Sequence, residues 1–146
     1  MLAILFIATS NFAIAQDNHR NAPENVRQNF HRDFPDANNA RWSRNNGQWH
    51  ANFDDRSSED RGEMVAHYDR NGRYIDSHIP YARQDVPTPV YNSAHRRYSH
   101  QNNLNFIRIE NPGMGDLFQV RVNINGRTRT SYYDENGRAR QYNDRH

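Results

Sequence analysis

The chain has 146 residues, with 19 basic residues that are all arginine, 17 acidic residues and a formal net charge of +2. It contains no cysteine, which excludes a disulfide framework, a cysteine nucleophile and a thiolate metal site. The mean hydropathy is strongly negative, −1.20, but an aromatic content of 12% favours a folded core over a disordered chain.

The N-terminal residues 1–15 have the pattern of a secretory signal peptide. They are apolar from Leu2 to Ala8, end in Ala13-Ile14-Ala15 and are followed at once by polar residues. A short apolar run before a small-x-small tripeptide is typical of a cleaved leader, and it is too short to span a membrane. We therefore predict a signal peptide at 1–15, a flexible N-terminus at 16–22, and export to the bacterial periplasm or beyond.

Two segments place apolar residues four positions apart, the spacing of one face of a helix. The first has Val26, Phe30 and Phe34, with Pro23 before it and Pro35 ending it. The second repeats this spacing 64 residues later at Val90, Ala94 and Tyr98, and there we predict Thr88 as the N-cap and Pro89 as the first helical residue. Each segment predicts one short amphipathic helix.

After each helix the pattern changes to alternation of apolar and polar residues, which predicts strands with one buried face. Asn-Gly dipeptides at 46–47, 71–72, 125–126 and 136–137 separate these runs and are strong signals for tight hairpins. The predicted strands are 39–44, 48–54, 63–69, 73–79, 104–110, 117–124, 127–134 and 138–142.

The second half of the chain repeats the first. Besides the helix positions, Tyr-Asp-x-Asn-Gly-Arg at 68–73 recurs at 133–138, 65 residues later, and duplication of one unit is the simplest cause. We predict an α+β fold of two tandem repeats, 23–79 and 87–142, with a linker at 80–86 and a tail at 143–146. Each repeat is a helix followed by a four-stranded antiparallel meander, and together they form one curved sheet with the helices on one face.

The order of these motifs resembles a known family. Proline, Val-x-x-x-Phe, Phe-Pro-x-Ala, Trp, Trp-x-Ala-x-Phe and Tyr-Asp-x-Asn-Gly-Arg, repeated after a linker, are similar to the periplasmic β-lactamase-inhibitory-protein-like, PepSY-like proteins common in Bacteroidetes. The resemblance covers residues 22–142. It implies tandem helix-plus-sheet units that present a curved sheet to a protein partner. The inhibitors that give the family its name carry disulfides, which this chain lacks.

Acidic residues suggest two cation sites, and for each we favour an interpretation without a bound cation. Asp69-x-Asn71-Gly72 and its copy at 134–137 resemble a calcium loop, but the glycine and glutamate positions of an EF-hand are missing. We predict hairpin turns in which the aspartates accept N–H bonds. The loop from Asp54 to Glu63 holds five carboxylates; it could dock a basic partner or weakly hold a cation, but a solvated loop is the commoner outcome.

The eight histidines show no spacing typical of metal ligands. His95 and His100 are five residues apart, and His67 and His78 lie on separate predicted strands. We predict no metal site and no cofactor; the one arrangement left open is a weak surface site shared by His50, Asn52 and His67. The sequence also lacks a nucleophile elbow, a phosphate-binding glycine loop and a zinc-protease pair, so we predict that the protein is not an enzyme.

The interspersed acidic residues and the predicted export argue against nucleic acid as a partner. We hypothesise a non-catalytic periplasmic or secreted module that binds an envelope or secreted protein, in the manner of an inhibitor, through the exposed face of its sheet. The predicted contact residues are His50, His67, Arg121, Arg129 and Tyr132, with Arg121 and Arg129 close together on neighbouring strands. The alternatives are an anionic envelope polymer as partner and a ligand- or ion-sensing (calcium-responsive) envelope protein.

Overall fold

The computed structural model describes residues 21–55 and 62–143, so the predicted signal peptide lies outside the described residues. The helices are α1 (Glu24–Asp33), the 3-10 helix η1 (Arg83–Asp85) and α2 (Thr88–Arg97). The strands are β1 (Ala37–Asn45), β2 (Gln48–Asp55), β3 (Met64–Tyr68), β4 (Tyr74–Tyr81), β5 (Asn105–Glu110), β6 (Leu117–Ile124), β7 (Arg127–Asp134) and β8 (Ala139–Arg140). Within the described part of the chain, no helix is long and apolar enough to span a bilayer.

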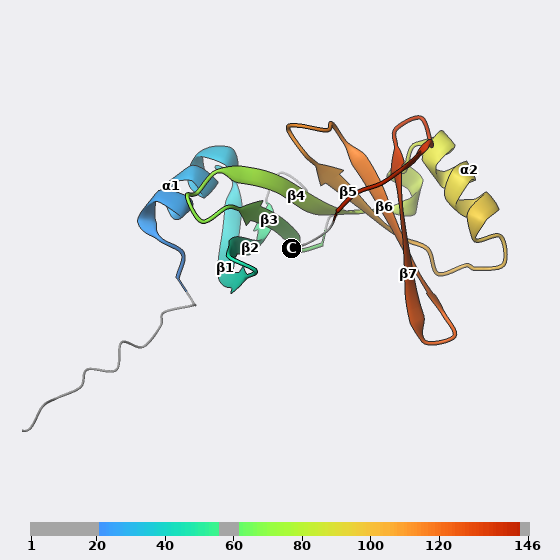
Figure 1. The fold of residues 1–146 in the computed structure, drawn as a ribbon, viewed down its shortest axis with the longest axis horizontal. Helices are drawn as coiled ribbons and strands as arrows, with labels where there is room; N and C mark the ends of the chain where they lie inside the picture. Colours follow the sequence, from blue (N-terminus) through green and yellow to red (C-terminus); the bar gives the residue numbers. More distant parts are fainter. Residues whose placement is uncertain (1–20, 56–61, 144–146) are drawn as a thin grey trace, which may run out of the picture.

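All eight strands form one antiparallel sheet in the order β1 to β8. The predicted α+β class with a single sheet is therefore confirmed. The two halves of the sheet join where β4 pairs with β5, from Ser77 opposite Glu110 to Tyr81 opposite Phe106. The two α-helices lie towards opposite ends of the molecule (Figure 1).

Each α-helix buries its apolar stripe in a separate core. Val26 and Phe30 of α1 pack with residues of β2, β3 and β4, whereas Val90 and Ala94 of α2 pack with residues of β5, β6 and β7. Ile79 belongs to the first core. Because strand residues two apart share a face, Ile79 lies on the same face as Tyr81, whose partner Phe106 belongs to the second core. Both helices therefore cover the same face, as predicted, and we call the other one the helix-free face.

The Tyr-Asp-x-Asn-Gly-Arg motifs form the β3–β4 and β7–β8 turns, and each turn packs against the helix of its own half. Gly72 has φ of +83°, and its carbonyl accepts a 2.7 Å hydrogen bond from Asn29 of α1. Gly137 has φ of +72°, and a Cβ there would lie 2.3 Å from the Pro89 carbonyl oxygen of α2. Glycine is needed at both positions because the backbone is left-handed and the helix is close.

Several boundaries differ from the sequence prediction, and those of β4, α2 and β8 bear on the repeats. Strand β4 continues to Tyr81, so Pro80 pairs with Ile107 instead of opening the linker. This is tolerated because Pro80 lies beyond His78, where the pairing of β4 with β3 ends. Helix α2 begins at Thr88, with Pro87 as a cap that makes no side-chain bond, one residue before the predicted start. Strand β8 is limited to Ala139–Arg140.

Candidate functional site

The helix-free face carries a line of histidines across the first half of the sheet. His50 of β2 lies opposite His67 of β3, as the alternation predicted, and their ring centroids are 4.5 Å apart. His67 is in turn opposite Asp76 of β4. The prediction that this part of the face is exposed is wrong for His67, which is 4% exposed. His67 is therefore removed from the predicted contact surface.

His67, Asp76 and His78 bring three potential ligand groups together. Nδ1 of His67 lies 2.6 Å from Oδ1 of Asp76, and Nε2 of His78 lies 3.7 Å from the same oxygen. The Asp76 side chain is fully buried, and that of His78 is 11% exposed. A carboxylate out of water is tolerated only where it is paired and hydrogen-bonded, and these contacts provide that pairing. His67 and His78 lie on separate strands, as predicted, but β3 and β4 are adjacent and place both histidines beside Asp76.

The C-terminal segment after β8 covers this histidine cluster. The hydroxyl of Tyr142 donates a hydrogen bond to Oδ2 of Asp76, 66 residues earlier in the chain. The Tyr142 ring also contacts that of Tyr132, with centroids 5.4 Å apart, and the Tyr132 hydroxyl accepts a 3.1 Å bond from Gln119. A polar network therefore runs along the helix-free face from the first half of the sheet to the second.

Arg121 and Arg129 lie on opposite faces of the sheet, which corrects the prediction that they lie close together. The two-residue turn at Asn125-Gly126 places Arg121 opposite Thr130, and Val122 opposite Arg129. Val122 belongs to the core under α2, so Arg129 is on the helix face. Arg121, by contrast, shares the helix-free face with Thr130 and Tyr132, because paired residues and residues two apart point the same way.

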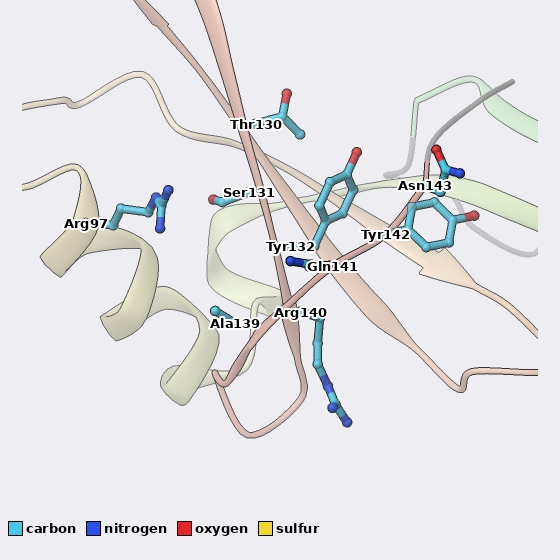
Figure 2. A pocket seen from close by; sticks show the side chains of 9 residues that line it. All are labelled: Arg97, Thr130, Ser131, Tyr132, Ala139, Arg140, Gln141, Tyr142 and Asn143. Atoms are coloured by element: carbon cyan, nitrogen blue, oxygen red, sulfur yellow. The ribbon is translucent and has the colours of Figure 1, made fainter.

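A hollow of about 600 Å³ lies at the edge of β7, where the C-terminal segment leaves the sheet. It is lined by Arg97, Thr130, Ser131, Tyr132, Ala139, Arg140, Gln141, Tyr142 and Asn143. Figure 2 shows the rings of Tyr132 and Tyr142 on one side of the crossing between β7 and this segment, with Arg97 on the α2 side. Within the described residues, β8 pairs only with Tyr132 and Tyr133 of β7. The preceding residues of β7 therefore pair with β6 along one edge and with no strand along the other.

The aspartates of the two repeated turns act as the predicted hydrogen-bond acceptors. Oδ1 of Asp69 accepts the backbone N–H groups of Asn71 and Arg73 at 2.8 and 2.9 Å, and Oδ1 of Asp134 accepts the two equivalent groups at 3.0 Å. Partial burial opposes ionisation of Asp69, but the N–H bonds outweigh it, so the pKa of this carboxyl is below its ordinary value. These oxygens are already used in holding the turns.

The acidic loop after β2 is described only at its ends. Asn39 donates to Oδ2 of Asp54 at 3.3 Å, and Arg41 forms an ion pair with Glu63. Exposed pairs of this kind contribute little stability. Glu59 and Asp60 lie outside the described residues.

Sequence reasoning missed Asp76 and Tyr142. Asp76 and His78 are two residues apart on a strand and thus share a face, and a search for that spacing beside His67 could have found the cluster. Tyr142 carries no such local signal, because it reaches the site through the path of the C-terminal segment.

The fold is shared with proteins from Bacteroides, although the sequence matches no protein-family model and no curated protein. A putative periplasmic protein from Bacteroides eggerthii has a TM-score of 0.73 and 14% identity, covering 83% of this chain and 87% of its own. A DUF2874 family protein from Bacteroides ovatus has a TM-score of 0.71 and 19% identity, covering 83% and 86%.

A BLIP-like protein from Bacteroides fragilis has a TM-score of 0.72 and 16% identity, covering 88% of this chain and 94% of its own. The TM-scores show a common fold, and at identities this low the likeness shows the fold alone. The share covered is high on both sides in all three comparisons, so the likeness extends across both halves of the sheet.

Proposed function

We propose that this chain is a bacterial periplasmic protein that has no catalytic activity and binds another envelope or secreted protein through the helix-free face of its sheet. The observation that carries the proposal is the side-chain composition of this face over β6, β7 and the C-terminal segment. It presents Arg121, Thr130, Tyr132, Arg140 and Tyr142 beside the 600 Å³ hollow. Tyrosine and arginine are the residues that most often anchor protein interfaces.

Several observations support a periplasmic location. The N-terminal apolar run ends in Ala13-Ile14-Ala15, as expected for a secretory leader, and the absence of cysteine fits a bacterial envelope. The fold is also that of proteins named putative periplasmic. A mode of action like that of an inhibitor is supported by the likeness to the BLIP-like protein.

The absence of catalysis is supported by the burial of the ionisable groups that converge. His67 and Asp76 are 4% and 0% exposed, and the Tyr142 hydroxyl occupies one carboxylate oxygen. General acid–base catalysis needs such groups within hydrogen-bond reach of a substrate. A buried pair whose carboxylate is already bonded is better suited to a structural role.

Duplication of one helix-plus-meander unit is the proposed origin of the chain, with repeats at 23–79 and 87–142 and a tail at 143–146. The equivalent hydrogen bonds of Asp69 and Asp134 support it, as do the equivalent positions of Gly72 and Gly137 beneath their own helices. Binding then depends on the residues in which the two halves differ, among them Arg121 and Tyr142.

Two charge reversals on adjacent strands test the binding face. The full chain is immobilised and used to capture proteins from a periplasmic extract of the bacterium that encodes it. Arg121→Glu is expected to remove the captured partner, whereas Arg129→Glu, the same change on the opposite face, is expected to leave capture unchanged. Equal effects of the two substitutions, or no specific capture by the wild type, would refute the proposal.

A further inference from the structure

We propose that His67, Asp76 and His78 form a binding site for a divalent transition-metal ion of the zinc type. The three ligand atoms all lie within 4.8 Å of one another on two adjacent strands. Two imidazoles and one carboxylate are a donor set that binds zinc in proteins. The three ligand residues are not among those of the proposed binding surface, although Tyr142 contacts both, and the ion site does not rest on the proposed function.

The distances between the donor atoms fit such an ion. Zinc bonds to histidine nitrogen and carboxylate oxygen are about 2.0–2.2 Å long, so two ligands of a tetrahedral ion lie about 3.3 Å apart. In this structure the two nitrogen–oxygen distances at Asp76 Oδ1 are 2.6 and 3.7 Å, which lie on either side of that value. All three donor atoms lie within 4.8 Å of one another, so side-chain rotations that bring each pair to about 3.3 Å would admit the ion.

Neighbouring side chains hold the three candidate ligand residues in place. His67 is held between two other imidazoles, since its ring centroid lies 4.5 Å from that of His50 and 4.8 Å from that of His78. His50 thus lies at the edge of the cluster. The Tyr142 hydroxyl donates to Oδ2 of Asp76 and leaves Oδ1 facing both histidines. Bonds of this kind orient a ligating carboxylate, which makes Tyr142 a positioning residue.

A bound ion would also stabilise the fold around the site. An ion at this site would join β3 to β4 and, through Asp76, hold Tyr142 and the C-terminal segment on the helix-free face. A ligand that binds only the folded chain raises its stability by mass action.

The test uses the full chain after removal of bound metal by a chelator. Zinc chloride is titrated by calorimetry, and one ion per chain is expected. His78→Gln is expected to weaken zinc binding more than Tyr142→Phe, which is expected to cost roughly 10- to 100-fold as the loss of a supporting contact. His100→Gln, which removes an exposed imidazole after α2, is the matched control and is expected to leave the affinity unchanged.

A spectroscopic measurement on the wild type keeps the test decisive if a variant fails to fold. Cobalt added in place of zinc is expected to give the intense visible bands of a four-coordinate ion, whereas weak six-coordinate bands would overturn the proposal. Calcium, which prefers six to eight oxygen ligands, is expected not to bind. No zinc binding by the wild type, or an equal loss in His78→Gln and His100→Gln, would also overturn it.

Discussion

Replacing Gly137 with alanine tests how closely the β7–β8 turn approaches helix α2. A Cβ at this position would lie 2.3 Å from the Pro89 carbonyl oxygen and 2.9 Å from Oγ of Ser93. Gly126, in the β6–β7 turn, is the matched control, because its φ of +76° is close to the +72° of Gly137 and nothing lies within 4 Å of its Cβ position. The two substitutions share the backbone strain and differ in the steric clash.

The expected losses of stability follow from these two terms. Alanine in the left-handed region costs about 1–2 kcal/mol, and the reduced freedom of the unfolded chain offsets about 0.4–1 kcal/mol of this. Gly126→Ala is therefore expected to lower the free energy of unfolding by about 1 kcal/mol. Gly137→Ala must also displace the first turn of α2, and overpacking of this kind adds about 1–3 kcal/mol. Its expected total is about 2–4 kcal/mol.

Urea unfolding followed by circular dichroism measures both variants against the wild type. A difference of at least about 1 kcal/mol between them is expected from the clash term. If the two variants lose the same stability, the β7–β8 turn does not lie against α2 as described, and the structural reason given for this glycine is wrong.

Two further predictions concern the first half of the sheet. Phe30 is 1% exposed, and its ring contacts those of Phe34, Trp42 and other aromatic residues. Phe30→Ala is therefore expected to lower the free energy of unfolding, measured in urea, by about 3–5 kcal/mol. A loss under about 1 kcal/mol would contradict the described core. The lowered pKa of Asp69 means that its ionised form stabilises the fold at neutral pH and that this contribution is lost as the pH falls below about 4. Asp69→Asn is therefore expected to lose less stability than the wild type between about pH 6 and about pH 3, and parallel pH profiles would refute this role.

The strands and hairpins could be predicted from sequence because their signals are local. Alternation and the Asn-Gly turn give the bounds of β6 and β7 as Leu117–Ile124 and Arg127–Asp134, and the structure has the same bounds. The two helices follow from apolar spacing in the same way, within one or two residues at their ends. Such features depend on neighbours within one or two turns of the chain.

Predicting on which face of the sheet a single residue lies required more than the alternation pattern. The turn at Asn125-Gly126 pairs residues across the hairpin so that Arg121 meets Thr130, and counting from that turn would have placed Arg129 on the opposite face. The burial of His67 could not be read locally. It depends on the pairing of β3 with β4 and on the C-terminal segment, which brings Tyr142 to Asp76 across 66 positions of sequence. Long-range contacts of this kind leave no periodic signal.

The central claim, that a protein partner binds the helix-free face, is tested most directly by photo-crosslinking in cells. A photoreactive amino acid is placed at Thr130 or at Arg129, which are neighbours on β7 whose side chains point to opposite faces. The account predicts a discrete crosslinked product from position 130 and none from position 129. A product from position 129 alone, or products of equal yield from both, would contradict it.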